Sequence, residues 1–165
     1  DYVVIKIPKW DTHKLKSADR RIGTEMKSVG EVMSIGRTFE EVIQKACRMV
    51  NPSLDGLEGE DSKIIDDDED LEESLRIPTD RRLFAVQLAL ERGWSVDKVF
   101  ELTKIDRWFL SKLMNIATMR KACKEAGSLS ALTQSNPRER LQSLKAAGFS
   151  DRQVRHSFSI KCRRC

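Results

Sequence analysis

The chain has 165 residues, of which 39% are hydrophobic and 34% are charged. This balance is typical of a folded soluble protein and excludes the low-hydrophobicity composition of a disordered chain. The length allows one ordinary domain, or one small domain and part of another. No apolar run approaches the roughly 20 residues of a membrane span, and the first ten residues lack a targeting pattern. We therefore expect no membrane partner, and the start at Asp1 predicts a piece of a longer chain.

The net charge of +4 is unevenly distributed. The segment from Glu58 to Glu73 holds ten acids and one lysine, which gives −9 there and +13 over the rest of the chain. Lys and Arg alternate with acids along most predicted helices, as they do on solvated faces, so we expect no nucleic-acid partner. The cysteines are too few and too scattered for a secreted disulfide framework, which favours a reducing compartment; they are Cys47, Cys123, Cys162 and Cys165.

The first residues predict two strands. Tyr2–Ile7 is rich in β-branched residues and is followed by Pro8, which predicts a buried strand that ends there. A second strand is predicted over Met26–Met33, and its alternation would place Lys27 and Glu31 on one face.

A helix is predicted after these strands. Thr38-Phe-Glu-Glu41 has the pattern of a capping box, and apolar residues then recur at three- and four-residue spacing as far as Asn51-Pro52. Two strands and one helix are too few for an independent sheet domain. Residues 1–52 are therefore interpreted as the end of a larger α/β domain.

Residues 53–79 are rich in glycine and acids, including Asp66-Asp-Asp-Glu-Asp70. Charge repulsion and the lack of apolar periodicity predict a solvated acidic linker. Clustered carboxylates could also bind calcium, but the required spacing of ligands around a glycine is missing.

The second half, residues 80–165, has an all-helical pattern. Helix starts are predicted at Asp80, Ser95, Asp106, Asn136-Pro137 and Ser150, the last as a capping box with Gln153. Gly93 and Gly148 are placed to end helices in a left-handed conformation.

No catalytic pattern emerges from the residues. The chain has neither a Gly-x-x-x-x-Gly-Lys-Ser/Thr loop nor a Gly-x-Gly-x-x-Gly turn, and its histidines, His13 and His156, lie far apart in sequence. Cys162 and Cys165, with His156 upstream, could form half of a zinc site, but no second pair is evident, and an unstructured tail is the simpler interpretation.

Lys27, Glu31 and Arg37 are the best candidates for polar chemistry. Lys27 and Glu31 could line a ligand cleft or form an internal ion pair, and we favour the ion pair. Four aromatic residues could form a stacking surface, but their helical spacing favours packing; they are Trp94, Phe100, Trp108 and Phe109.

Three strings together resemble a known family. Asp1–Trp10 and Met26–Glu41 resemble the end of the first ATP-grasp half of the large chain of carbamoyl phosphate synthetase, and Leu102–Leu110 resembles the signature of the oligomerisation domain that follows it. The valine at position 29 resembles the residue found there in the first half, which is the carboxyphosphate-forming half. The resemblance covers residues 1–155, whereas Val154–Cys165 departs from the family pattern.

The resemblance implies a mainly α fold, in which a small α/β remnant of an ATP-grasp domain (1–52) and an acidic linker (53–79) precede a truncated helical oligomerisation domain (80–165). The helical domain would then lack part of its core, so we expect marginal stability and exposed apolar surface.

The resemblance also implies a function. The parent protein would be a ligase that uses two ATP, with magnesium, to join bicarbonate to ammonia or glutamine-derived ammonia, for pyrimidine and arginine synthesis or the urea cycle. The family's catalytic, ATP-binding and metal-binding residues lie outside this chain, so none is assigned here, and Lys27, Glu31 and Arg37 would have supporting roles. Expected partners are the other domains of the large chain, a glutaminase subunit or domain, and a second copy bound through the helices. The expected compartment is the cytoplasm or the mitochondrion. The alternative is a free-standing helical interaction or adaptor module without catalytic activity.

Overall fold

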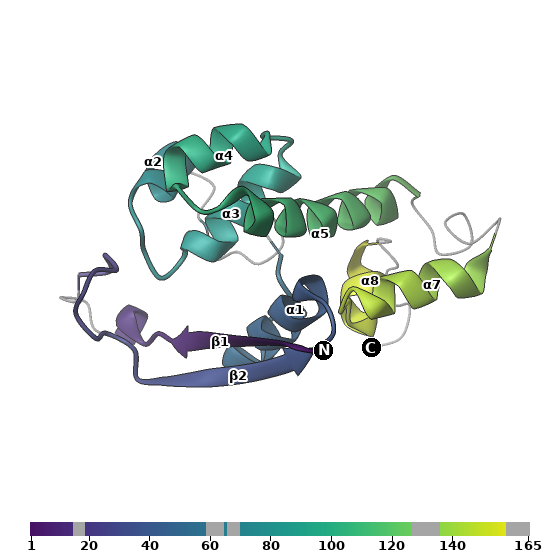
Figure 1. The fold of residues 1–165 in the computed structure, drawn as a ribbon, viewed down its shortest axis with the longest axis horizontal. Helices are drawn as coiled ribbons and strands as arrows, with labels where there is room; N and C mark the ends of the chain where they lie inside the picture. The colour runs from purple at the N-terminus through teal and green to yellow at the C-terminus, as the bar shows by residue number, and fades with distance from the viewer. Residues whose placement is uncertain (15–18, 59–64, 66–69, 127–135, 158–165) are drawn as a thin grey trace.

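The computed structural model describes residues 1–14, 19–58, 65, 70–126 and 136–157, and it is mainly α-helical with one two-stranded antiparallel sheet. The sheet and α1 form one layer at the bottom of Figure 1, α2 to α5 lie above it, and α7 and α8 lie beside α1.

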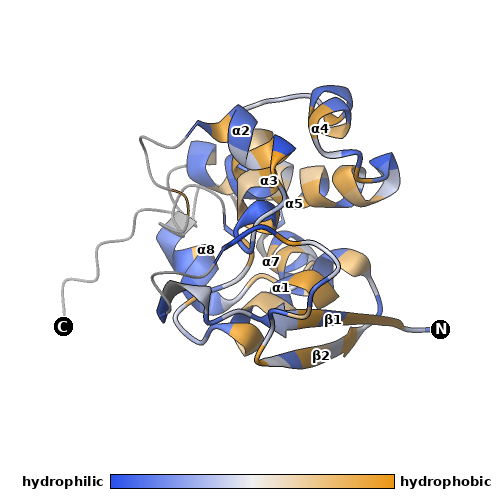
Figure 2. Ribbon diagram, turned by 90° about the vertical axis from the view of Figure 1, so that its left-hand side faces the viewer, coloured by the Kyte–Doolittle hydropathy of each residue, from blue (hydrophilic) through white to orange (hydrophobic). Residues whose placement is uncertain are grey.

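The sheet pairs β1 (Val3–Lys9) with β2 (Gly30–Gly36). The register places Ile5 opposite Ser34 and Ile7 opposite Val32 on the inner face, which packs on α1. Val4 opposite Ile35 and Lys6 opposite Met33 form the outer face. Figure 2 shows that apolar residues occupy much of both strands.

Both predicted strands are present in the structure, but their predicted bounds were wrong. Pro8 does not end β1, because its missing N–H is tolerated at this position opposite Glu31 in a two-stranded ribbon. β2 begins only at Gly30, so Met26 and Lys27 lie before the strand. The predicted shared strand face of Lys27 and Glu31 is therefore wrong.

α1 (Phe39–Val50) begins with the predicted capping box. The Thr38 hydroxyl accepts a hydrogen bond from the Glu41 N–H at 3.3 Å, and the Glu41 carboxylate accepts one from the Arg37 N–H at 2.9 Å. The bond from the Arg37 N–H is the main cause of a lowered pKa of the Glu41 carboxyl, and the nearby Lys45 ammonium lowers it further. The helix ends at Asn51, as predicted.

The prediction of a solvated linker after α1 was wrong for two stretches. Residues 54–58 are buried, with Leu57 fully enclosed in the core. Leu71–Arg76 forms α2, whose first turn is capped by the carboxylate of Asp70. The interpretation of the acidic residues 59–64 and 66–69 falls outside the described residues.

The remaining helices follow most of the predicted signals. α4 (Val96–Thr103) is capped by Ser95, α5 (Arg107–Ala126) follows Asp106, and α7 (Pro137–Ala146) follows Asn136. α8 (Asp151–Ser157) begins with a reciprocal pair of hydrogen bonds between Ser150 and Gln153.

One predicted helix cap was wrong. α3 (Arg82–Glu91) has no side-chain cap, because the carboxylate of Asp80 instead accepts hydrogen bonds from Thr12 and Arg20. Burial raises the pKa of Asp80, but the bonds from Arg20 and Thr12 outweigh burial, and the net pKa lies below the ordinary value. The carboxylate of Asp80 thus binds Arg20, which lies 60 residues away in sequence, and does not cap the neighbouring helix.

Candidate functional site

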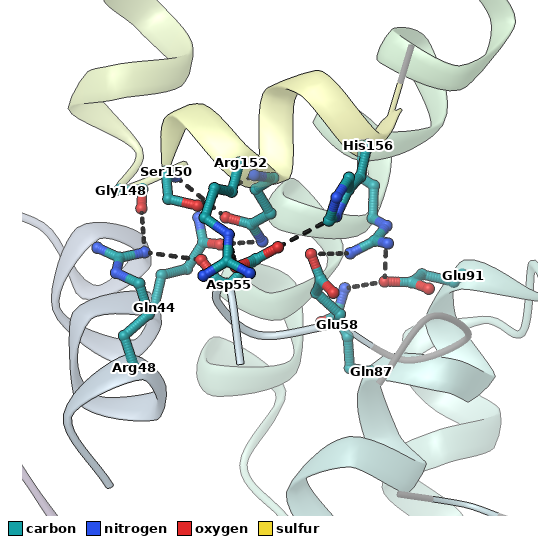
Figure 3. A network of polar contacts seen from close by, with 12 residues as sticks. Gln44, Arg48, Asp55, Glu58, Gln87, Glu91, Gly148, Ser150, Arg152 and His156 are labelled. Atoms are coloured by element: carbon teal, nitrogen blue, oxygen red, sulfur yellow. Dashed lines mark hydrogen bonds and ion pairs between the residues drawn. The ribbon is translucent and has the colours of Figure 1, made fainter. Parts of the chain in front are cut away.

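Polar side chains, several of them fully buried, meet where α1, residues 55–58, α3, α5 and α8 converge (Figure 3). We call this cluster the polar junction; it comprises Gln44, Arg48, Asp55, Glu58, Gln87, Glu91, Arg120, Gly148, Ser150, Arg152, Gln153 and His156. Buried polar groups cost free energy unless they are paired, so the pairing in this cluster decides whether it stabilises the fold.

An amide pair forms one end of the junction. Gln44 of α1 donates to the carbonyl of Ala147 at 2.7 Å, and Gln153 of α8 donates to the side-chain oxygen of Gln44 at 2.8 Å. Both glutamines are fully buried. A Cβ on Gly56 would lie 2.5 Å from the Gln153 amide, so only glycine leaves room for this pair.

Arg48 and Asp55 join α1 to the chain around α8. The Arg48 guanidinium donates to the carbonyl of Gly148 at 2.8 Å and to that of Asp55 at 3.3 Å. The Asp55 carboxylate pairs with Arg152 at 3.2 Å and with Nδ1 of His156 at 3.1 Å. Burial lowers the pKa of Arg48, although an arginine still keeps its charge at neutral pH.

Arg120 of α5 occupies the other end of the junction and is 1% exposed. Its guanidinium lies 3.2 Å from the carboxylate of Glu58 and 3.8 Å from that of Glu91. Glu91 also accepts a hydrogen bond from Gln87 at 3.0 Å. A buried arginine between two carboxylates contributes little net stability, but the loss of one partner is strongly destabilising.

The junction therefore fixes α1, on which the sheet packs, against the chain around α8 and residues 55–58 against α3 and α5, and its geometry is that of a structural clamp. The nearby thiol of Cys47 is buried, which raises its pKa to about 12, so it is not a reactive nucleophile at neutral pH. Within the described parts of the chain, no group of three or more His, Cys, Asp or Glu side chains could hold a metal ion. The same parts contain no helix that is long and apolar enough to cross a membrane.

Sequence reasoning identified Gln153 only as a capping residue and did not single out Gln44 or Arg120. A signal for Arg120 was present, because it continues the spacing of the buried residues Leu113, Ile116 and Ala117 on α5. A cation on an apolar helix face predicts a buried carboxylate partner, although not which one.

The three predicted polar candidates do not meet. Lys27 donates to the backbone carbonyls of Arg21 at 2.8 Å and Asp19 at 3.2 Å, while Glu31 forms a cross-strand ion pair with Lys6. Arg37 is exposed and contributes only its backbone N–H to the cap of α1. The favoured Lys27–Glu31 ion pair is therefore wrong, because the strand begins after Lys27.

The four aromatic candidates fall into two groups. Trp94 and Phe100 are partly buried and pack against the core, as predicted. Trp108 and Phe109 are 52% and 44% exposed, and each ring contacts that of Phe39 at a steep angle, with a centroid separation of 5.6 Å. The Trp108–Phe109 pair is thus a surface feature that joins α5 to α1. The zinc hypothesis for Cys162 and Cys165, and the side chain of His13, lie outside the described residues.

Exposed apolar residues concentrate on the outer face of the sheet and the segment before β2. Met33 is 54% exposed and Ile35 is 48% exposed, and Val4 lies opposite Ile35 in the register. Exposed apolar patches of this kind mark surfaces that contact other protein. The exposed apolar surface predicted for a truncated helical domain is a different surface, because these residues belong to the sheet, and that prediction stays a prediction.

Comparisons with known proteins give a consistent result. Residues 31–164 match the family model described as carbamoyl-phosphate synthetase large chain, oligomerisation domain. The chain is 49% identical over 160 residues to the carbamoyl phosphate synthase arginine-specific large chain of Eremothecium gossypii, which covers 96% of this chain and 14% of that protein. It is 50% identical over 155 residues to the mitochondrial arginine-specific large chain of Schizosaccharomyces pombe (93% and 12%).

A further relative carries a different name. The chain is 45% identical over 156 residues to the mitochondrial carbamoyl-phosphate synthase [ammonia] of Aquarana catesbeiana, which covers 93% of this chain and 10% of that protein. The chain thus spans only 10% to 14% of the length of these relatives.

Proposed function

Since the chain belongs to the carbamoyl-phosphate synthetase large-chain family, we propose that it is the connecting and oligomerising segment of such an enzyme. The parent protein is then an ATP-dependent ligase that makes carbamoyl phosphate from bicarbonate and ammonia, or ammonia released from glutamine. ATP and magnesium bind in other parts of the parent chain. This segment contributes contacts that assemble the domains and copies of the large chain. The parent protein acts in the cytoplasm or the mitochondrion.

The polar junction is the observation that carries this proposal. A connector must hold two units in a fixed relative orientation, and buried polar contacts give orientation because they tolerate only one geometry. Gln44 and Gln153 are 109 residues apart in sequence, and their hydrogen bond links α1 directly to α8. The sheet held by this clamp presents Met33 and Ile35 outward, where a preceding domain of the parent chain would pack.

A segment swap tests this function. The matching segment of the Schizosaccharomyces pombe arginine-specific large chain, which is 50% identical, would be replaced by residues 1–157 of this chain in a strain that lacks the native gene. We expect the chimera to support carbamoyl phosphate synthesis and growth without arginine. A chimera that accumulates to the normal level but makes no carbamoyl phosphate would overturn the proposal.

The second candidate is a free-standing helical interaction module without catalytic activity. The exposed Trp108–Phe109 pair favours it, because exposed aromatic residues are enriched at protein interfaces. An immunoblot of the source cells separates the two candidates. A product near 18.9 kDa supports the module, and a much larger product supports the ligase.

A further inference from the structure

A groove of about 760 Å³ lies between β1, the end of α1 and the start of α3. We call it the β1–α3 groove. Part of its wall is apolar and includes Ile7, Ile43 and Phe84. Two residues from the chain before β2, Arg20 and Ile22, also line it. A displacement of that chain would therefore open the groove and expose its apolar wall.

Residues 19–29, which we call the strap, precede β2 and lie outside any helix or strand. Every residue from 21 to 26 is exposed. Burial of apolar side chains therefore contributes little to the position of the strap, which depends on polar contacts instead. A segment held in this way opens at a lower free energy than the core of the same protein.

The contacts that hold the strap to the rest of the chain converge on the start of α3. Arg20 donates two hydrogen bonds to the carboxylate of Asp80, at 2.9 and 2.8 Å. The Ile22 N–H donates to the carbonyl of Pro78 at 2.8 Å. Two parallel bonds between a guanidinium and a carboxylate are stronger than a bond between neutral groups, so the Arg20–Asp80 pair is the main fastening.

The strap also has internal contacts that do not involve α3. The ammonium of Lys27 donates to the carbonyls of Asp19 at 3.2 Å and Arg21 at 2.8 Å. It also lies 3.5 Å from the Asp19 carboxylate. These contacts would persist if the Arg20–Asp80 pair separated. The strap can therefore leave α3 as one unit.

From this arrangement we propose that the strap is a latch on the β1–α3 groove. The latch is closed while Arg20 is paired with Asp80, which is the form seen in the structure. It opens when that pair separates, while β1, β2 and α3 stay folded. The hydrogen bond from Thr12 to Asp80 at 2.6 Å lies outside the strap and keeps the chain after β1 on α3 in both forms. The latch does not depend on the function proposed above.

Amide hydrogen exchange of the purified chain, resolved by NMR, tests the latch. The Ile22 N–H reports on the strap, because its acceptor on Pro78 lies outside the strap. Leu88 is buried in α3 and reports on the core. We expect the protection factor of Ile22 to be at least about tenfold lower than that of Leu88 in the native chain. Equal protection of the two amides would overturn the proposal.

Removal of the ion pair should open the latch. Asp80→Asn should lower the protection of Ile22 at least a further tenfold or so and leave that of Leu88 unchanged. Arg20→Gln should have the same effect, and it decides alone if Asp80→Asn fails to fold. Unchanged protection of Ile22, or an equal loss at Ile22 and Leu88, would refute the latch.

Asp97→Asn is the matched control. It breaks an ion pair of the same type, between Asp97 and Arg107 at 2.7 Å, at a residue that does not line the groove. The protection of Ile22 should therefore stay at the native value in this variant. A loss equal to that in Asp80→Asn would show a general effect of charge and would refute the latch.

Opening of the groove has a separate readout. Trp10 lines the groove and is partly buried. A soluble nitroxide should broaden the NMR signal of its indole N–H more strongly in Asp80→Asn than in the native chain or in Asp97→Asn. Equal broadening in all three proteins would show that the strap does not cover the groove and would overturn the proposal.

Discussion

Gly148 follows α7 with a φ of +86°, and a Cβ placed there would lie 2.8 Å from the backbone of Glu41. Two separate requirements, the left-handed conformation and the close approach of α1, therefore fall on one residue. Gly93 has nearly the same φ of +85° but has open space around its Cβ position. The two glycines form a matched pair in which only the packing differs.

We predict that Gly93→Ala costs about 1–2 kcal/mol of unfolding free energy, the usual penalty for a left-handed alanine. Gly148→Ala should cost clearly more, because the backbone of α1 must also move. Urea denaturation of both variants measures the difference. Equal losses would mean that α1 does not press on Gly148.

Gln153 is the residue on which the amide pair of the polar junction depends. In Gln153→Leu the oxygen of Gln44 loses its buried donor and the N–H of Ser150 loses its acceptor. We expect a loss of about 1–3 kcal/mol per buried group left unpaired. Arg155→Gln on the same helix is exposed and should change the unfolding free energy little; a similar loss in both variants would count against the junction.

Cys47 gives a prediction on reactivity. Because burial raises the pKa of its thiol to about 12, the reactive thiolate is scarce at pH 8. Alkylation of Cys47, followed by mass spectrometry of its peptide, should be slow in the native chain and fast in urea. Rapid native alkylation would contradict the burial of this thiol.

At the scale of elements, residues 54–58 behave as part of the core rather than as a connection. Leu57 is fully buried and Asp55 and Glu58 supply carboxylates to two ends of the polar junction. Residues 54–58 form neither a helix nor a strand, yet their side chains link α1 to α5 and α8.

Leu57→Ala should therefore cost about 2–5 kcal/mol, as large-to-small changes in a core do. Met49→Ala removes a side chain that is 50% exposed and serves as the control, with a much smaller expected loss. Thermal and urea unfolding of the two variants would decide; a negligible effect of Leu57→Ala would restore the interpretation of this stretch as a solvated linker.

At the scale of the whole molecule, the outer face of the sheet is an apolar surface that the described residues leave uncovered. Met33 and Ile35 contribute to it from β2. We predict that the purified chain self-associates at rising concentration and that Met33→Lys with Ile35→Lys reduces this association without loss of unfolding free energy. Sedimentation velocity measures the first and urea denaturation the second. If the purified chain without these substitutions stayed monomeric at every concentration, the prediction would be refuted.

Much of the helical architecture follows from local signals. The capping box at Thr38, the Ser95 cap and the reciprocal Ser150–Gln153 bonds lie within a few residues of the sequence, so each could be predicted without the fold. Gly93 was predictable for the same reason, because a left-handed helix end favours glycine. Family membership also followed from contiguous strings.

The tertiary structure alone decided the register of the strands, the burial of Leu57 and the composition of the polar junction. Asp80 could have capped α3, yet its carboxylate binds Arg20, which no local pattern encodes. Gln44 and Gln153 meet across 109 residues, and neither side chain specifies its partner. Local hydrogen bonds are determined by neighbouring residues, whereas the partners of buried polar groups are determined by which distant elements pack together.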